Sequence, residues 1–524
     1  MTRRQKKWWI AISIIVGTAM IALVLMGLAM KRRFDPYIRQ QVRDYLEMRF
    51  DSQVEIGDLH IQLPDISSLR LLLNRRRGAV AAITGESIVL RHKGRRDVPP
   101  LFVIHSVRFN VDLATLFDTP KSIMNVEVEG MEINIPPKQS RLKFDMPPDS
   151  GESWTKGIII EEVVFRNSQL SLLPKDPEKP PLRFDIHEMI FKSVARQTSM
   201  RYDASLTNAK PPGEILANGD FGPWNADEPG DTPMDGKYRF ENADLGVFKG
   251  IAGKLNSTGN FSGTLDTINV EGEAVVPDFH LKRSGNIRAL RTAFQAQVDG
   301  TNGNTILKPV KGTLGSTSFV TSGAVIKNEN EKHRTIRLEF TMPNGDLRDL
   351  LMLAMKGRPF MVGRISLNTK IVIPPLSGSV REKLQLDGTF EITDGKFLNS
   401  KIQDQIDTLS RRSQGQPKNQ AIDEVVSQMG GRFTLNDEVI AFSPISFSVP
   451  GSGIDLTGSY DMGQDILDFH GTLRMEAKIS QTVTGWKHWL LKPVDPFFSK
   501  QGFGTLLNIK VDGTMDTPHF GRDH

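Results

Sequence analysis

The residue types that most often carry catalysis are present, but they are not arranged in any recognised pattern. The ten histidines are scattered, none belongs to a His-Glu-x-x-His zinc motif, and His187-Glu188 is a neighbouring pair inside a predicted strand. No Gly-x-Ser-x-Gly elbow or phosphate-binding loop occurs, and glycine pairs such as Gly451 and Gly453 are typical of turns. The absence of cysteine excludes disulfides, thiolate metal sites and cysteine nucleophiles. We therefore expect no enzymatic activity, no cofactor and no metal site.

One short stretch has the charge to bind anions. Eight Lys and Arg residues lie between positions 70 and 96, with only Asp65, Glu86 and Asp97 nearby as acidic residues. Each basic residue close to a membrane surface contributes about 1 kcal/mol of attraction to anionic lipids. The alternative is a set of solvated loops without a ligand. The candidates for contact with anionic headgroups are Arg75, Arg76, Arg77, Arg95 and Arg96.

A membrane is implied by the segment from Trp8 to Met30, which is 23 residues long and uncharged. A helix of that length crosses the hydrocarbon core, and Trp8 and Trp9 would lie at the first interface. Its apolar core is longer than that of a usual signal peptide, a second basic cluster follows it, and no small-x-small cleavage site is evident. We expect an uncleaved anchor at 8–30 after a cytoplasmic tail at 1–7.

The anchor region also explains most of the basic character of the chain. Residues 1–34 contain seven Lys and Arg and no acidic residue, so the net charge of +5 falls to −2 for the remainder. A nearly neutral body argues against a general nucleic-acid binder. Basic residues lie on both sides of the helix, so the positive-inside rule alone does not favour export of the C-terminal part.

A short amphipathic helix is predicted to follow the anchor, at 31–52. Asp35 is a suitable N-cap, Pro36 suits the first helical position, and apolar residues recur at helical spacing. This helix is either a packed connector or a helix on the membrane surface.

From residue 53 the apolar period changes to two, which predicts β-strands. A first β region at 53–245 contains the segments VEIGDLHIQL, GESIVLRH, FVIHSVRFNVDL, NVEVEGMEINI, GIIIEEVVF, SQLSLL and FDIHEMIFKSV, separated by Gly- and Pro-rich loops. The alternation shifts phase at Gly57-Asp58, which suggests a bulge. Because few helices interrupt these strands, we expect an antiparallel meander of hairpins.

Two further β regions are predicted, at 246–380 and 381–524. The first contains a helix at 346–356. The second contains helices at 400–411 and 421–429 and an apolar, tryptophan-rich helix that includes Trp486 and Trp489. The clearest hairpin turns at residues 462–464. Its strands place one set of apolar residues on a single face: Ile454, Leu456, Tyr460, Leu467, Phe469 and Leu473.

A strand that is apolar on one side must bury that side. A second sheet covers it in a closed sandwich, whereas in an open curved sheet it lines a groove that holds an apolar ligand. Alternation alone does not separate these arrangements, and the physical properties of the sequence as a whole slightly favour one sandwich or several small ones.

Several segments resemble the AsmA-like family (AsmA/TamB-type proteins). At the N-terminus they are the basic tail, the membrane helix, FDPYIRQQVRDYLEMRF and VEIGDLHIQLPDISSLRL. From residue 381 onward they are LDGTFEITDGKFLNSKIQDQIDTLSRR, GRFTLNDEVIAFSPISFSVPGSGIDLTGSYDMGQDILDFHGTLRM and KVDGTMDTPHF. The part between about 140 and 380 matches only in style.

The resemblance implies a single-pass protein of the Gram-negative inner membrane with its bulk in the periplasm. It implies a mainly β fold with an open, curved groove and an apolar floor, as in bridge-like lipid-transfer proteins. The expected function is to carry phospholipid toward the outer membrane or to support outer-membrane assembly. The partners would be membrane lipids and outer-membrane assembly factors, without nucleic acid or a small-molecule substrate. The alternatives are a lipid-free scaffold for outer-membrane protein assembly and a module that binds carbohydrate or the envelope.

The orientation of the anchor is open to a direct test. We expect a reporter fused after His524 that is active only in the periplasm to be active, because the resemblance requires export of the body. Activity of a reporter that works only in the cytoplasm would contradict this orientation.

Overall fold

The fold is seen in a computed structural model that describes most of the chain after residue 51. The described residues are 52–62, 80–92, 94–112, 121–135, 158–173, 180–194, 198–223, 231–264, 266–299, 303–328, 331, 333–416, 425–477, 504–515 and 517–523. They form two compact units. Unit 1 takes the described parts of Met1–Asp244, Leu255–Gly272 and Gln297–Gly303, and unit 2 takes those of Leu245–Lys254, Glu273–Ala296 and Asn304–His524.

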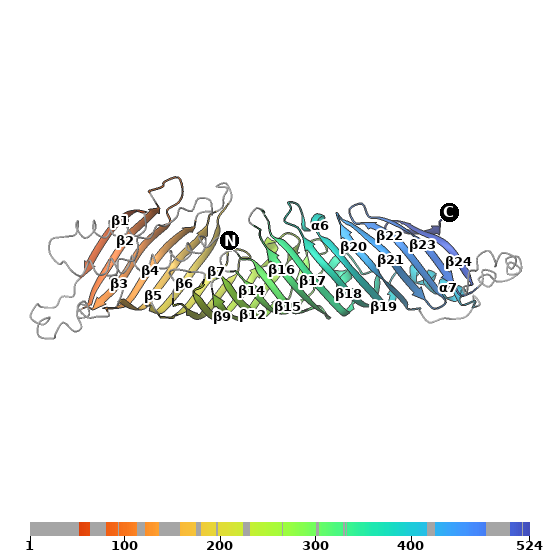
Figure 1. The fold of residues 1–524 in the computed structure, drawn as a ribbon, viewed down its shortest axis with the longest axis horizontal. Helices are drawn as coiled ribbons and strands as arrows, with labels where there is room; N and C mark the ends of the chain where they lie inside the picture. The colour runs from red at the N-terminus through yellow and green to blue at the C-terminus, as the bar shows by residue number, and fades with distance from the viewer. Residues whose placement is uncertain are drawn as a thin grey trace, which may run out of the picture. The chain divides into compact units, whose positions relative to one another are not determined.

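Unit 1 is a long sheet in which consecutive strands lie side by side (Figure 1). Each strand from β1 to β9 pairs with the next, and β11 pairs with β9. Two more strands, β12 (Thr267–Val276) and β14 (Leu290–Val298), are divided between the units. The strands of unit 1 are β1 (Ser52–Gln62), β2 (Val80–His92), β3 (Phe102–Asp112), β4 (Lys121–Ile135), β5 (Ile158–Leu172), β6 (Leu182–Val194), β7 (Met200–Thr207), β8 (Glu214–Phe221), β9 (Pro233–Asp244) and β11 (Lys254–Thr264).

The predicted meander is confirmed except around β5. The segments GIIIEEVVF and SQLSLL, expected as two strands, are one strand of 15 residues, because Asn167 between them adopts a left-handed conformation (φ 48°) without ending the strand. Moreover, β4 and β5 are parallel, which a hairpin cannot achieve. The expectation of hairpins throughout is therefore wrong at this step.

A row of kinks crosses β1–β6 at one level. Its members are Gly57, Ser87, His105, Gly130, Asn167 and His187. Pairing is interrupted at each of these residues but resumes in the same register, as where Ile56 faces Ile88 and Asp58 faces Glu86. Side chains change faces there, since Ile56 is buried before the kink and Leu59 after it. The predicted phase shift at Gly57 is therefore real, but it is shared by neighbouring strands and is not one extra residue on β1.

The kink row ends between β6 and β7. The register of these two strands shifts between Ile186 and Glu188, which leaves His187 as a one-residue bulge. Strands beyond β6 alternate without this interruption, as in β8 and β9.

Unit 2 is a second meander, in which each strand from β15 to β25 pairs antiparallel with the next (Figure 1). Among the pairings described, none joins the first strand of either unit to its last, so neither sheet closes on itself. The strands of unit 2 are β10 (Ile251–Ala252), β13 (His280–Leu281), β15 (Thr305–Leu314), β16 (Thr317–Ile326), β17 (Thr335–Asp346), β18 (Met361–Ile373), β19 (Gln385–Phe397), β20 (Ser427–Asn436), β21 (Val439–Val449), β22 (Ser452–Asp461), β23 (Ile466–Met475), β24 (Thr505–Gly513) and β25 (Pro518–Arg522).

Short helices interrupt unit 2. The helix expected at 346–356 is α5 (Leu347–Ala354), capped by the side chain of Asp346, and the helix expected at 400–411 is α7 (Ser400–Ser413). Two short elements were not predicted: α6 (Val380–Lys383), which begins with a capping box at Ser379, and the 3₁₀ turn η4 (Leu245–Val247).

The helix expected at 421–429 is wrong where the structure describes it. Val425 and Val426 are irregular, and Ser427 begins β20, whose pairing with β19 outweighs the local helical spacing of the apolar residues. Residues 421–424 lie outside the described part of the chain.

Several predicted elements also lie outside the described residues. They are the anchor at 8–30 with Trp8, Trp9 and Met30, the linker helix at 31–52 apart from its last residue, and the tryptophan-rich helix. Within the described ranges, no helix is both long and apolar enough to cross a bilayer.

Close packing between neighbouring strands can be tested with a matched pair of glycines in β22 and β23. A Cβ on Gly471 would run into the carbonyl oxygen of Asp455 on the next strand, whereas a Cβ on Gly453 would meet no atom within 4 Å. We expect Gly471→Ala to lower the free energy of unfolding by about 1–3 kcal/mol. Gly453→Ala should stay within about 0.5 kcal/mol of the parent in calorimetry of the full chain. Equal losses would contradict the close contact at Gly471.

Candidate functional site

The six apolar candidates of the predicted hairpin share one face of β22 and β23. Ile454 lies opposite Leu473 and Tyr460 lies opposite Leu467, with Leu456 between them on the same side. Leu467 and Phe469 are 8% exposed, while Ile454, Leu456, Tyr460 and Leu473 are half-buried. We call the side of each sheet that carries the buried and half-buried apolar residues its apolar face.

The apolar face of unit 2 is covered largely by lateral contacts between neighbouring strands. Four phenylalanines form a continuous series, in which the ring centroids of Phe390 and Phe442 are 6.1 Å apart and those of Phe442 and Phe469 are 5.8 Å apart. Phe433 completes it, 6.2 Å from Phe390 and 6.5 Å from Phe442. The surrounding cluster draws its residues from consecutive strands, β19 to β24. Packing of this kind forms an apolar floor and does not require a second sheet.

Two helices border this floor along one edge of the sheet. Helix α5 connects β17 to β18 and packs Leu347, Leu350 and Leu351 onto a cluster that contains Met361 and Ile365. Helix α7 connects β19 to β20, and its Ile406 and Leu409 pack against Phe447 and Val449. The two connections leave the sheet at the same edge, which we call the helical edge.

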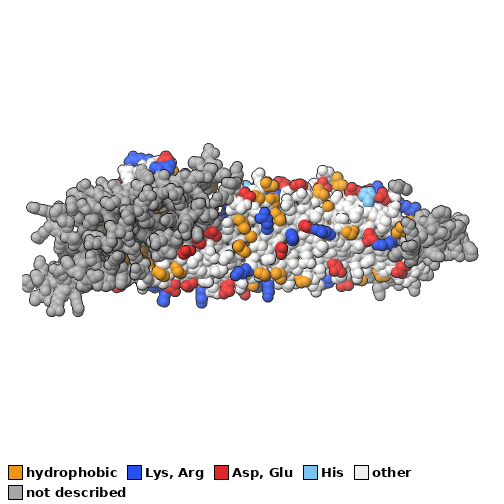
Figure 2. Space-filling model, viewed as in Figure 1, with side chains coloured by type: hydrophobic (Ala, Val, Ile, Leu, Met, Phe, Trp, Pro, Cys, Tyr) orange, Lys and Arg blue, Asp and Glu red, His pale blue; other side chains and the backbone are white. Residues whose placement is uncertain are grey.

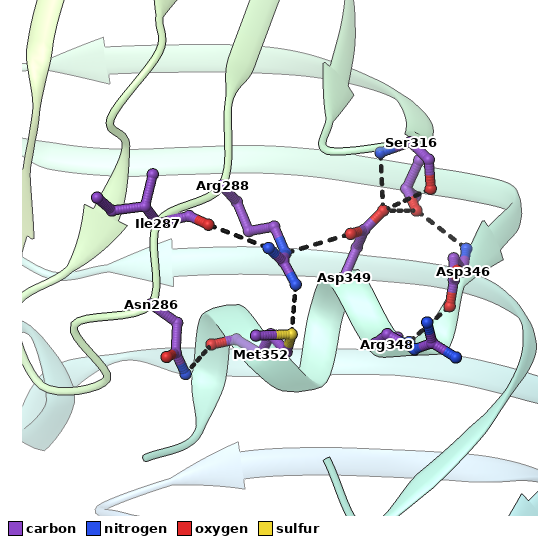
Figure 3. Close-up of polar contacts among 9 residues, drawn as sticks. Asn286, Ile287, Arg288, Ser316, Asp346, Arg348, Asp349 and Met352 are labelled. Carbon is purple, nitrogen blue, oxygen red and sulfur yellow. Dashed lines mark hydrogen bonds and ion pairs between the residues drawn. The ribbon is translucent and has the colours of Figure 1, made fainter. Parts of the chain in front are cut away.

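Helix α5 is fixed by a polar network that is mostly buried (Figure 3). One oxygen of Asp349, Oδ2, accepts hydrogen bonds from the backbone N–H of Ser316 at 2.8 Å, from the Ser316 hydroxyl at 2.8 Å and from the Thr317 hydroxyl at 3.0 Å. The other, Oδ1, lies 3.2 Å from Nε of Arg288. Arg288 also contacts the sulfur of Met352 on the same helix. Helix α5 is therefore tied both to the β15–β16 turn and to the segment before β14.

The opposite edge of unit 2 is held by α6, and we call it the α6 edge. Arg381 pairs with Glu438 at 2.8 Å and donates to the carbonyl oxygen of Met462, so α6 links the β20–β21 and β22–β23 turns. The Tyr460 hydroxyl donates to Asp465 at 3.0 Å. Burial, followed by the hydrogen bond to Asp465 and the charge of that residue, raises the pKa of Tyr460 to about 12. Tyr460 thus stays a neutral hydroxyl where the apolar face meets solvent.

The apolar face of unit 1 changes along its length. In β1–β4 it is deeply buried, as shown by Ile83 at 0%, Phe109 at 1% and Val126 at 0% exposure. In β8 and β9 the corresponding residues, such as Ile215, Phe221 and Phe240, are only half-buried. This stretch therefore leaves apolar surface within reach of a ligand.

Two tyrosines lie across glycines on the half-buried part of unit 1. The Tyr202 hydroxyl lies beside Gly236, where a Cβ would come within 2.8 Å of it, and the Tyr238 hydroxyl lies beside Gly272 at 2.9 Å by the same measure. Tyr238 also lies 3.1 Å from the hydroxyl of Ser257. Burial raises the pKa of both tyrosines. Aromatic rings thus continue the floor where the strands themselves carry no side chain.

Most residues that alternate with the apolar face are polar or charged, although a few large apolar residues, such as Leu216 and Ile306, are exposed there. Cross-strand pairs there include Arg166 with Glu188 at 3.1 Å and Arg432 with Asp387 at 3.0 Å. Figure 2 shows basic and acidic side chains interspersed on the face it presents, in keeping with the balanced charge of the body. The two sides of each sheet therefore differ in chemistry.

The predicted headgroup residues are only partly within the described chain. Arg75, Arg76 and Arg77 lie outside it. Arg95 donates to Asp97 at 3.0 Å, which raises the pKa of Arg95, and Arg96 lies 3.9 Å from Glu55. Both arginines therefore already have carboxylate neighbours, and their role in headgroup contact stays a prediction.

Sequence reasoning missed the polar network around Asp349 and the tyrosines over glycines. The alternation of Gly and Tyr in β9 was a visible signal, whereas the meeting of Arg288 with Asp349, 61 positions later in the numbering, had none. Within the described ranges, no group of His, Asp and Glu side chains could hold a metal ion.

Comparison with known proteins leaves the chain without an assigned relative. No family model, no curated protein and no solved structure matches it.

The anchoring of α5 can be tested at Asp349. Asp349→Asn removes the charge that faces Arg288 and replaces one acceptor of three hydrogen bonds, so the free energy of unfolding should fall by about 2–4 kcal/mol. Asp387→Asn is the matched control, because its partner Arg432 is exposed, and its effect should be at most about 1 kcal/mol. Denaturant unfolding of the full chain measures both. Equal effects would show that the Asp349 network does not hold α5.

Proposed function

We propose that this protein is a membrane-anchored carrier whose apolar faces hold the acyl chains of phospholipids. In this proposal the segment at 8–30 anchors the chain in the inner membrane, and the body lies in the periplasm and supplies lipid to the outer membrane. The resemblance to AsmA-like proteins supports the location in the inner membrane and periplasm. The apolar faces of the structure support the binding of acyl chains.

The observation that carries the proposal is the single-layer construction of the apolar face in unit 2. Phe390, Phe442 and Phe469 contact one another along the sheet, and Leu456 beside them remains half-buried. In a sandwich, side chains from a second sheet would complete the burial of such residues. Here the remaining apolar surface has the chemistry to take flexible hydrocarbon.

A phenylalanine floor suits movement as well as binding. Each CH₂ group kept from water contributes about 0.8 kcal/mol, wherever along the floor it lies. A chain that slides along the floor exchanges one apolar contact for another, so the free energy changes little at each step. The headgroup stays in water along the edge of the sheet, since burying an unpaired charge is costly.

The same reasoning limits which strands take part. In β1–β4 the apolar face is already buried to the level of a protein core, so a ligand would gain little by binding there. The proposed lipid contacts are β8 and β9 of unit 1 and, in unit 2, the half-buried apolar residues of β19–β23, such as Phe390, Leu456 and Leu473.

Neighbouring residues of β22 allow the proposal to be tested in living cells. Leu456 lies on the apolar face and Thr457 on the exposed face of the same strand. A photo-crosslinking amino acid at position 456 should become attached to phospholipid, detected by mass spectrometry of the purified full chain. The same amino acid at position 457 should not. Absence of lipid adducts at 456, with the protein folded and exported, would overturn the proposal in favour of a lipid-free scaffold.

A substitution at the same site tests function. Leu456→Asp places a charge where acyl chains would pass, and we expect co-purified phospholipid to fall severalfold with little loss of stability, because the position is half-buried. Thr457→Asp should leave the lipid content unchanged. Collapse of the fold in Leu456→Asp alone would instead indicate a closed core.

A further inference from the structure

One tyrosine hydroxyl lies on the apolar face of unit 1 without a partner in the protein. Tyr202 is 9% exposed, and its hydroxyl makes no hydrogen bond to any of the described residues. Most buried polar groups in proteins are hydrogen-bonded, and a buried hydroxyl that lacks a partner lowers the stability of the fold. A group of this kind on a proposed binding surface points to a ligand.

Two glycines allow the hydroxyl to reach its position. Tyr202 on β7 lies opposite Gly219 on β8, and Gly219 lies opposite Gly236 on β9. Because neither glycine has a side chain, the ring extends over β8, and a Cβ added at Gly236 would come within 2.8 Å of the hydroxyl. The phenol of Tyr202 therefore spans one whole strand and ends above β9.

The surroundings of the hydroxyl are apolar. The same Cβ at Gly236 would lie 2.9 Å from Cζ of Phe261 on β11, so this ring borders the hydroxyl on one side. On the other side, the ring centroid of Phe191 on β6 lies 6.4 Å from that of Tyr202. The backbone of β9 is paired with β8 on one side and with β11 on the other. A partner for the hydroxyl must therefore be a ligand or water.

The hydroxyl of Tyr202 is a neutral group. Burial, followed by the charges of Asp235 and Asp220, raises its pKa. These two carboxylates face each other on β8 and β9 and are exposed on the opposite side of the sheet. A neutral phenol donates one hydrogen bond, and on an apolar floor its best acceptor is an uncharged oxygen, since a charged group would lose its hydration there.

The depth of the hydroxyl matches one part of a phospholipid. Tyr202 is the third residue of β7, Gly219 is the third from the end of β8, and Gly236 is the fourth of β9. At about 3.3 Å per residue, the hydroxyl lies about 7–10 Å inside the edge where β8 ends and β9 begins. A lipid whose phosphate stays in water at this edge brings its ester carbonyls a few bonds farther in, where its hydrocarbon begins.

Tyr238 repeats the arrangement with a difference. Its ring lies across Gly259, and its hydroxyl lies beside Gly272, as Tyr202 does with its own two glycines. However, the Tyr238 hydroxyl already has a partner, the hydroxyl of Ser257 at 3.1 Å. Tyr238 also lies in the middle of β9 and not near its end. It therefore serves as a matched comparison within the same sheet.

We propose that the Tyr202 hydroxyl donates a hydrogen bond to an ester carbonyl of a phospholipid whose acyl chains lie along the half-buried strands of unit 1. This proposal rests on the lipid-carrying function above and adds a chemical group that is recognised. The carbonyl supplies the acceptor that the protein does not provide, so the hydroxyl is no longer unpaired. An ether-linked phospholipid has the same headgroup and the same hydrocarbon but no carbonyl, and it would lack this contact.

The proposal predicts a preference for ester-linked over ether-linked lipid. The full chain would carry a photo-crosslinking amino acid in place of Ile215, a half-buried residue on the same face of β8. It would be placed in nanodiscs that contain equal amounts of diester and diether phosphatidylethanolamine, and the adducts would be quantified by mass spectrometry. We expect ester adducts to exceed ether adducts by about two- to tenfold, the range that one hydrogen bond gives. In Tyr202→Phe the two adducts should become equal, because only the ester adducts decrease.

Two measurements separate the hydrogen bond from the packing of the ring. Tyr238→Phe also removes one hydroxyl and keeps the ring, and it should retain the parent's preference. The thermal unfolding temperature of Tyr202→Phe should be no lower than that of the parent, because the lost hydroxyl has no partner in the protein. A clear decrease would show that the hydroxyl is bonded within the fold and would contradict the proposal.

The outcomes distinguish this proposal from the function on which it rests. If the parent forms no adduct with either lipid at position 215, the lipid-carrying function fails for unit 1, and this proposal fails with it. Equal amounts of ester and ether adducts in the parent, or the parent's preference in Tyr202→Phe, would overturn the ester contact alone and leave the lipid-carrying function in place.

Discussion

The constraint behind this structure is that a sheet with one apolar side must cover that side without a second sheet. In unit 2, contacts between side chains of neighbouring strands cover it. Bulky aromatic rings on neighbouring strands contact one another along the sheet, and Phe442 touches partners on both sides. Lateral packing leaves Phe390 and Phe442 half-buried, because the outer surface of the layer still faces away from the strands, while Phe433 and Phe469 are 9% and 8% exposed. The remaining exposed apolar surface is thus a consequence of the construction, and a ligand of flexible hydrocarbon completes it.

Helices supply what lateral packing cannot. Helices α5 and α7 both leave the sheet at the helical edge and turn apolar residues back onto the floor. For α5, hydrophobic contact alone would leave the orientation of the helix free, and the Asp349 network fixes it by directional bonds to the β15–β16 turn and to Arg288 in the segment before β14. At the helical edge apolar residues of α5 and α7 thus pack onto the floor, while at the α6 edge Arg381 pairs with Glu438 and the Tyr460 hydroxyl donates to Asp465.

Local patterns in the sequence predicted some parts of the fold well. Strand alternation predicted the hairpin of β22 and β23 and the shared face of Leu456 and Phe469, because the period of two is a property of the backbone itself. The helices α5 and α7 were also predicted, and each follows a strong N-cap residue, Asp346 or Asn399. In contrast, the spacing at 421–429 suited a helix, and pairing of Ser427–Asn436 with β19 decided otherwise. The parallel pairing of β4 with β5 and the position of Arg288 over α5 depend on long-range contacts, for which a single sequence carries no signal.

The kink row in unit 1 continues from each strand to the next. A kink in one strand must be matched in the strand paired with it if the register is to be kept, and Gly57, Ser87 and Gly130 provide this match in β1, β2 and β4. It ends only at His187, where one additional residue takes up the mismatch against β7. An insertion or deletion beside Ser87 would therefore have to be matched in several other strands at once. The first six strands are therefore coupled in length and register, whereas the strands beyond β7 are not held by this row.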